Sequence, residues 1–283
     1  MRILTDFDGV WTDQAGEARF IQSWLARVTA PLIGATPEEA LRDFDAFFAA
    51  ALAQPASNGW APDGRITGFA DEDLLMSTGS VFHWLENGGS HPRADLWRSR
   101  IRGAGHDSIE AYASDQFQPA MTEYLDAHDH RLVDGAADVV RELLLRGHEI
   151  AFVSNSSQNK LATMLGDAGI LEGAGVRVIG NARKWWIRDD EPLVSVAGRR
   201  VHMDRPHYRA ILEDVRPDLV IGDVASFDLA LPAYMRSRGE LSEGLRLVLR
   251  RSANTSAWAL AQPGESGPVR LVDEVVDSVR ELL

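Results

Sequence analysis

Two segments of the chain carry closely spaced aspartates. Residues 6–13 have the sequence DFDGVWTD, with Asp6 and Asp8 directly after the first apolar run, and GDVASFD places Asp223 and Asp228 after a later run. Carboxylates packed together are costly unless a cation lies among them. Mg²⁺ suits such a place, since it binds a few carboxylates together with waters and phosphate oxygens. Either segment taken alone could also be a polar turn, because aspartate is a common turn residue.

Two further features could hold an anion. The segment VSNSS places Ser154 and Asn155 between an apolar run and a helical pattern, and hydroxyls and N–H groups at a helix N-terminus bind anions. The same residues would also serve as ordinary helix caps. A cation is needed to offset the clustered aspartates, and the order of preference is Arg205, then Lys184, then Lys160.

Short apolar runs alternate with helical patterns in the parts of the chain that carry these motifs. The alternation predicts βαβ units, and therefore a doubly wound, Rossmann-like α/β fold with a mainly parallel sheet. Ligands bind beyond the carboxyl ends of the strands in such a sheet, where the motifs would meet. The closing segment, residues 273–283, has valines at helical spacing and predicts a helix. The predicted strands are Met1–Thr5, His148–Val153, Val176–Ile179, Leu219–Ile221, Leu245–Leu249 and, more weakly, Val269–Val272.

Residues 14–130 have a different texture, mostly helix and loop. Thr36, Pro37 and Glu39 carry the signature of a helix N-terminus and predict a helix over 37–53. We interpret 14–130 as a largely α-helical domain inserted into a catalytic core made of 1–13 and 131–283. A run of Trp and Arg near Trp97 could set specificity, although core tryptophans and a solvated face are the commoner explanation.

Composition bounds the location and the partners. The chain has 283 residues, is 45% hydrophobic and has a net charge of −13, which disfavours nucleic acid and anionic membranes as partners. It has no cysteine, so disulfides, thiolate catalysis and Cys-based zinc sites are excluded. No signal-peptide pattern and no run of about 18 uncharged apolar residues is present. We therefore expect a soluble, cytoplasmic protein of undetermined oligomeric state.

The segments DFDGVWTD, VSNSS, RP before a helical pattern, and GDVASFD, in that order, resemble the motifs of the haloacid dehalogenase superfamily. The resemblance covers residues 1–13 and roughly 131–283, and the intervening part resembles the cap domain of that superfamily. It implies that Asp6 is a nucleophile that forms an aspartyl-phosphate, and that Asp8 is a general acid and base.

The same resemblance implies a set of binding residues. Mg²⁺ would be bound by Asp6, by Asp8 through its backbone carbonyl, and by Asp223. Ser154 and Asn155 would hold the phosphoryl oxygens together with Arg205 or Lys184, and Asp228 would orient the cation or the waters of the metal. The third motif of the superfamily usually carries lysine, so Arg205 is a departure from the pattern.

Asp8 and Asp223 together favour phosphoryl transfer over carbon–halogen cleavage, since the dehalogenase branch lacks the second aspartate and the magnesium. Phosphonate cleavage would need a lysine in the cap, and no lysine precedes Lys160. Hydrolysis of a phosphomonoester is the commoner outcome of this chemistry, and a large cap favours a small-molecule substrate enclosed between the domains. A phosphomutase is the first alternative. A non-catalytic phosphate-binding or regulatory module is the second, and the complete set of aspartates argues against it.

Overall fold

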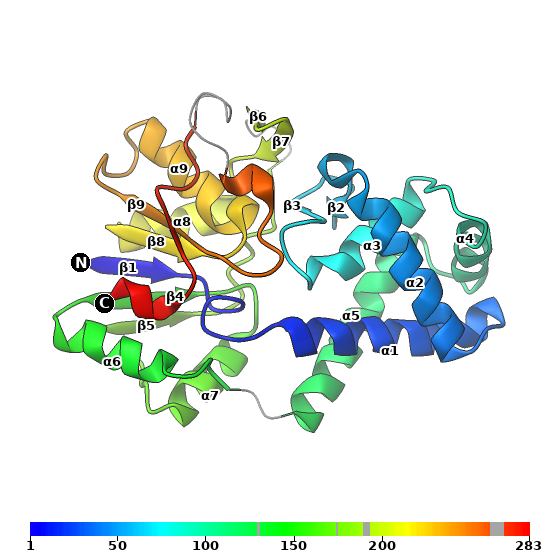
Figure 1. The fold of residues 1–283 in the computed structure, drawn as a ribbon, viewed down its shortest axis with the longest axis horizontal. Coiled ribbons are helices and arrows are strands. Elements are labelled where there is room, and N and C mark those ends of the chain that lie inside the picture. Colours follow the sequence, from blue (N-terminus) through cyan, green and yellow to red (C-terminus); the bar gives the residue numbers. More distant parts are fainter. Residues whose placement is uncertain (129–130, 174, 189–192, 261–268) are drawn as a thin grey trace. The chain divides into compact units, whose positions relative to one another are not determined.

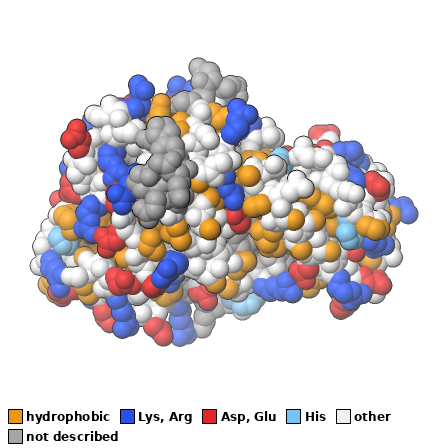
Figure 2. Space-filling model, turned by 45° about the horizontal axis from the view of Figure 1, so that its top comes forward, with side chains coloured by type: hydrophobic (Ala, Val, Ile, Leu, Met, Phe, Trp, Pro, Cys, Tyr) orange, Lys and Arg blue, Asp and Glu red, His pale blue; other side chains and the backbone are white. Residues whose placement is uncertain are grey.

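The computed structural model describes residues 1–128, 131–173, 175–188, 193–260 and 269–283. The chain divides into two compact units, one made of residues 1–13 and 130–283 and the other of residues 14–129 (Figure 1). On the face of the molecule shown in Figure 2, acidic and basic side chains are intermixed with apolar ones. No helix in the described ranges is both long and apolar enough to cross a membrane.

The first unit is built on a six-stranded sheet with the order β10-β9-β8-β1-β4-β5, in which all neighbours are parallel. The predicted doubly wound α/β core is confirmed. The order along the chain reverses between β1 and β8, and open α/β sheets bind ligands at such a point. The strands are β1 (Arg2–Thr5), β4 (Glu149–Val153), β5 (Val176–Ile179), β8 (Leu219–Gly222), β9 (Arg246–Arg250) and β10 (Glu274–Val276).

Helices cover both faces of this sheet. Figure 1 shows α6 (Ala136–Leu145) and α7 (Gln158–Asp167) on one face, with α8 (Pro206–Val215) and α9 (Ala230–Ser237) on the other. The core under α6 and α7 joins Ile3, Phe152 and Ile221 of three strands to apolar side chains of both helices. Each such buried side chain contributes about 1.5–3 kcal/mol. An antiparallel hairpin, β6 (Leu193–Val196) and β7 (Arg199–His202), was not predicted from the sequence.

Two predictions at the C-terminal end of the chain are wrong. Residues 269–272 form no strand, and the predicted helix over 273–283 is replaced by β10 followed by a 3₁₀ helix, Val279–Leu282. β10 pairs with β9, and Val275 is 36% exposed whereas Val276 is 1% exposed, which is the alternation of a strand. The valine spacing fits either element, so periodicity alone could not separate them.

The second unit is helical, as predicted for the inserted segment. Thr36 and Glu39 form the predicted capping box, because the Glu39 N–H donates to Thr36 Oγ1 (3.2 Å) and the Thr36 N–H to Glu39 Oε2 (2.9 Å). Trp97 is buried and donates from Nε1 to Asp43 Oδ2 (3.0 Å), so it is a core residue. The elements are α1 (Ala15–Ile33), α2 (Pro37–Leu52), α3 (Met76–Glu86), α4 (Ala94–Gly103), α5 (Ile109–Ala127) and a small pair, β2 (Gly59–Trp60) and β3 (Gly68–Phe69).

Candidate active site

Three aspartates meet at the carboxyl ends of β1 and β8. Asp6 follows β1, and its N–H donates to the Ile221 carbonyl of β8 at 2.8 Å, which places it beside the loop that carries Asp223 and Asp228. One carboxylate oxygen from each of the three aspartates lies within 4.8 Å of the other two. All three side chains are buried. Within the described ranges, no other three carboxylate or histidine side chains lie so near to one another.

Two glycines permit this close approach. Gly9 has a φ of 79°, and a Cβ there would lie 1.9 Å from Asp223 Oδ2. A Cβ on Gly222 would lie 2.2 Å from the Asp228 Cβ. Any side chain at either position would therefore push an aspartate out of the cluster.

Trp11 anchors the turn that carries Asp6 and Asp8. It is fully buried, its Nε1 donates to Thr5 Oγ1 (2.7 Å), and its ring packs edge-on against Phe152 with centroids 5.6 Å apart. The Trp11 N–H also donates to the Phe7 carbonyl (2.9 Å), which closes the turn. Trp11 therefore fixes the turn against β1 and β4 through its contacts with Thr5 and Phe152.

Lys184 is the cation that contacts Asp6. Its ammonium bonds to the Asp6 carboxylate and to Asp228 Oδ1 (2.6 Å), and all three side chains are buried. Burial alone would lower the pKa of Lys184, but Asp228 and Asp6 raise it above its usual value, so the side chain is an ammonium. Burial raises the pKa of Asp6 well above its usual value; Lys184 opposes this rise, whereas Asp228 and Asp8 add to it.

Arg205 and Asn155 contact the backbone of Lys184. The Lys184 N–H donates to Asn155 Oδ1 (2.7 Å), and Arg205 Nη1 donates to the Lys184 carbonyl (2.6 Å). Lys184, and not the preferred Arg205, is thus the cation in contact with Asp6, and the choice between them as the phosphate-binding cation stays a prediction. The segment before Lys184 turns back sharply through positive φ values at Asn181 (52°) and Arg183 (49°), which sequence patterns do not reveal. Phosphate contacts of Arg205 and Asn155 stay predictions.

Asp8 is held by Ser154 and Lys160. Ser154 Oγ donates to Asp8 Oδ2 (2.6 Å), and Lys160 Nζ lies 2.9 Å from Asp8 Oδ1. Burial alone would raise the pKa of Asp8, but the charge of Lys160 and the hydrogen bonds from Ser154 and Lys160 lower it below its usual value. Asp8 is therefore a carboxylate in the metal-free protein. Ser154, which the sequence predicts to bind phosphate, contacts Asp8 in this structure.

Lys160 was the weakest of the three cation candidates predicted from the sequence, and the composition of the chain could have ranked it higher. The chain contains only two lysines, Lys160 and Lys184, among its 29 basic residues. Both are buried, and each contacts one aspartate of the first motif. Lysine is rarely buried unless it is paired, so both positions point to the site.

The donor set fits a hard divalent cation. Asp6, Asp223 and Asp228 offer carboxylate oxygens close to one another, whereas the Asp8 side chain is occupied by Ser154 and Lys160. The role predicted for the backbone carbonyl of Asp8 stays a prediction. The buried charged side chains at these strand ends also leave an excess of negative charge. Four aspartates face three cations, namely Asp6, Asp8, Asp223 and Asp228 against Lys160, Lys184 and Arg205.

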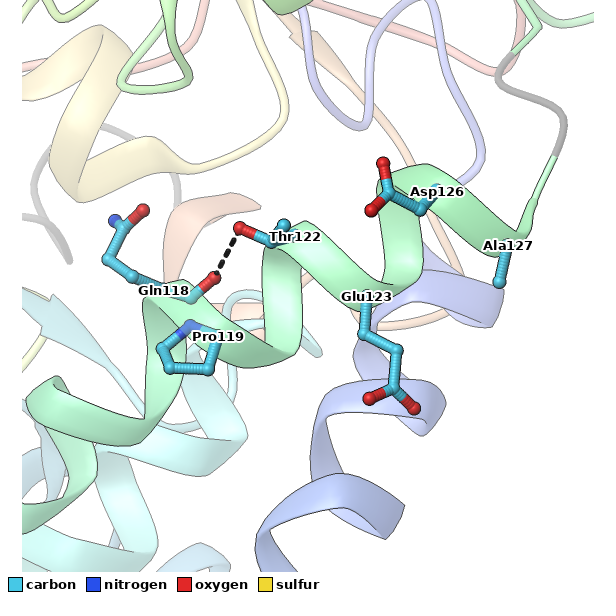
Figure 3. Close-up of a pocket in the computed structure, with 6 residues that line it drawn as sticks. All are labelled: Gln118, Pro119, Thr122, Glu123, Asp126 and Ala127. Carbon is cyan, nitrogen blue, oxygen red and sulfur yellow. Dashed lines mark hydrogen bonds between the residues drawn. The ribbon is translucent and has the colours of Figure 1, made fainter.

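A depression on the second unit has a different character. Figure 3 shows it along α5, where the Thr122 hydroxyl donates to the backbone carbonyl of Gln118. The charged residues that line it are Glu123 and Asp126. Glu123 already pairs with Arg27, at 2.9 Å. None of the motif residues lines this depression, so the candidate chemistry lies at the strand ends of the first unit.

Comparisons with known proteins found matches among solved structures only. No family model matches the chain, and no curated protein matches it. Among solved structures, a variant of CbbY from Rhodobacter sphaeroides matches with a TM-score of 0.47 and 14% identity, over 99% of this chain and 95% of that one. The 2-haloacid dehalogenase of Pseudomonas syringae matches with a TM-score of 0.44 and 15% identity, over 99% and 95%. A HAD phosphatase of Thermococcus onnurineus matches with a TM-score of 0.45 and 11% identity, again over 99% and 95%.

These matches extend over nearly the whole of each chain. The strand order of the core, the helical unit that follows β1, and the motifs at the strand ends are properties of this chain itself.

Proposed function

We propose that the chain is a magnesium-dependent phosphatase that hydrolyses a small-molecule phosphomonoester through an aspartyl-phosphate on Asp6. The observation that carries the proposal is the buried cluster of Asp6, Asp223 and Asp228 at the switch point of the sheet, with Asp8 two residues beyond Asp6. Such a cluster is unfavourable without a cation, and carboxylates at a strand end suit Mg²⁺. When bound, Mg²⁺ would neutralise charge on the phosphoryl oxygens.

In the first step, a carboxylate oxygen of Asp6 attacks phosphorus, and the bond from phosphorus to the ester oxygen breaks. The departing oxygen takes a proton from Asp8, so an alcohol leaves and Asp6 carries the phosphoryl group. Lys184, bonded to Asp6 and Asp228, offsets negative charge beside the nucleophile. Asp8 is ionised at rest and must first take up a proton, which the negative charge of an arriving phosphate favours.

In the second step, Asp8 acts as a base. It takes a proton from water while the water oxygen bonds to phosphorus, and the bond from Asp6 to phosphorus breaks. Inorganic phosphate leaves, Asp6 is again a carboxylate, and Asp8 is again protonated. One aspartate thus serves as acid and then as base, which requires that its carboxyl group keep one orientation through both steps.

A panel of metabolite phosphates and p-nitrophenyl phosphate, assayed with Mg²⁺ and with EDTA, tests the proposal. We expect phosphate release that EDTA abolishes and that Asp6→Asn reduces by at least about 10³-fold, because the amide is not a nucleophile. Arg177→Gln is the control, since Arg177 is half exposed and pairs with Asp214 on the surface. Transfer of the phosphoryl group to a second hydroxyl of the substrate, without release of phosphate, would indicate a phosphomutase. A folded protein that turns over no ester would contradict both activities.

A further inference from the structure

We propose that Lys160 is a positioning residue, which together with Ser154 fixes the Asp8 carboxyl group in the orientation that delivers its proton to the leaving group. The inference rests on the proposed function and adds a residue to its machinery. Lys160 lies outside the four motif segments, on the first turn of α7.

The contacts of Asp8 define the orientation of its carboxyl plane. Lys160 Nζ bonds to Oδ1 at 2.9 Å and Ser154 Oγ donates to Oδ2 at 2.6 Å, so each oxygen has its own donor. Ser154 Oγ is itself fixed, because it accepts the Ser156 N–H at 2.9 Å. A carboxylate oxygen has a second lone pair, so a proton can be held or passed on without breaking either bond.

The backbone of Lys160 is fixed as firmly as its ammonium group. Its N–H donates to Oγ of Ser157, the N-cap of α7, at 3.2 Å, and Nζ also lies 3.4 Å from Ser156 Oγ. The Lys160 side chain is 4% exposed. Burying an ammonium is costly unless a partner compensates for its lost hydration, and Asp8 supplies that compensation.

The choice of lysine at this position is also informative. The other basic residues of the chain, apart from Lys160 and Lys184, are arginines. Guanidinium is a planar fork that binds a carboxylate through two parallel bonds and would occupy both oxygens of Asp8. A compact ammonium contacts Oδ1 and leaves Oδ2 to Ser154, as observed.

Loss of the Lys160 contact should lower kcat/KM most for the esters whose leaving group depends most on protonation by Asp8. Phenyl phosphate and p-nitrophenyl phosphate have nearly the same shape, but phenol is the poorer leaving group and depends more on the acid. The ratio kcat/KM covers the steps up to formation of the aspartyl-phosphate, so the later hydrolysis step does not enter the comparison.

The experiment compares wild type with Lys160→Gln on these two esters in the presence of Mg²⁺. We expect kcat/KM for phenyl phosphate to fall about tenfold more than kcat/KM for p-nitrophenyl phosphate, which is a part of the 10²–10⁴-fold that acid–base catalysis contributes in full. A double-mutant cycle with Asp8→Asn should show that Lys160→Gln has little further effect on either ester once Asp8 is gone. Asn159→Ala, on an exposed position of the same helical turn, should change neither ratio.

Equal losses on both esters, or an undiminished effect of Lys160→Gln in the Asp8→Asn background, would overturn the inference. Lys160→Arg provides a second variant in case the glutamine variant unfolds. It keeps the charge that compensates Asp8, but it should still penalise phenyl phosphate more, because the fork alters the carboxyl plane. Wild-type protein that hydrolyses neither ester nor any metabolite phosphate would refute the proposed function itself, so the two failures are distinguishable.

Discussion

Replacing Lys184 with methionine removes an ammonium and leaves two carboxylates buried without it. Asp6 is 8% exposed and Asp228 is 2% exposed, and Lys184 itself is 2% exposed. Methionine has a similar length and retains the packing of the aliphatic stem. The variant therefore tests the charge and its bonds, with little change in volume.

The expected cost follows from this burial. Breaking a buried ion pair by removing one partner costs about 3–5 kcal/mol, because the remaining charge stays buried and uncompensated. For a unit of the size of residues 1–13 and 130–283, each kcal/mol lowers the melting temperature by about 2–4 °C. We therefore expect a decrease of about 6–20 °C for Lys184→Met. The loss of a donor beside Asp6, the proposed nucleophile, should also reduce kcat by about 10²–10³-fold.

Thermal unfolding followed by circular dichroism, in EDTA, measures the effect on stability. Arg177→Met is the matched control, because Arg177 and Asp214 form an exposed pair with side chains 53% and 58% accessible. Such a pair contributes about 0–1 kcal/mol. Adding Asp228→Asn to Lys184→Met should recover part of the lost stability, since one uncompensated charge is removed. A Lys184→Met effect no larger than that of Arg177→Met would refute the buried-pair reasoning.

Two further predictions concern the metal site and the glycine beside it. The pKa of Asp6 is raised in the folded metal-free protein, so the folded state binds the proton of this group more tightly than the unfolded state does. The resulting contribution to the free energy of unfolding is fully present below the unfolded pKa of about 4, and it is lost as the pH rises through the folded pKa. Mg²⁺ competes with that proton, and the rise in melting temperature that Mg²⁺ produces should increase with pH; a pH-independent rise would contradict the assignment. Gly222→Ala should lower the free energy of unfolding by about 1–3 kcal/mol and remove most of the activity, because the new Cβ meets Asp228. Gly166→Ala on α7 is the control, because that position has open space around it. In a denaturant titration the control should be neutral or slightly stabilising.

The strands that carry the motifs could be predicted from the sequence because they are central in the sheet. The strands β1, β4 and β8 are apolar runs buried on both faces, and a polar motif follows each one, so a short apolar run is informative there. The edge strand β10 has three residues, of which Glu274 is half-buried, Val275 is exposed and Val276 is buried. Its valines fit a helical face equally well, and only its pairing with β9 decides the structure.

The contacts of the cations could not be predicted, because they depend on segments far apart in the chain. Lys184 reaches Asp6 because Asn155 and Arg205 hold the two polar groups of its own backbone. Neither contact leaves a periodic pattern in the sequence. The motif pattern favoured Arg205, which precedes Pro206, whereas the lysine that contacts Asp6 lies in a loop after β5.

The contacts of the two lysines are consistent with the proposed binding of a cation from solution. Each ammonium is bound to a different aspartate of the first motif, Lys184 to Asp6 and Lys160 to Asp8. Lys184 is shared with Asp228, and the charge of Asp223 adds to the same cluster, so the protein's own cations do not balance its carboxylates. A fixed third ammonium would balance the resting site, but it would leave no net positive charge to attract a phosphate dianion. In the proposed mechanism, a divalent ion would reverse the sign of the cluster, so the site would be anionic when empty and would attract phosphate only when the metal is bound.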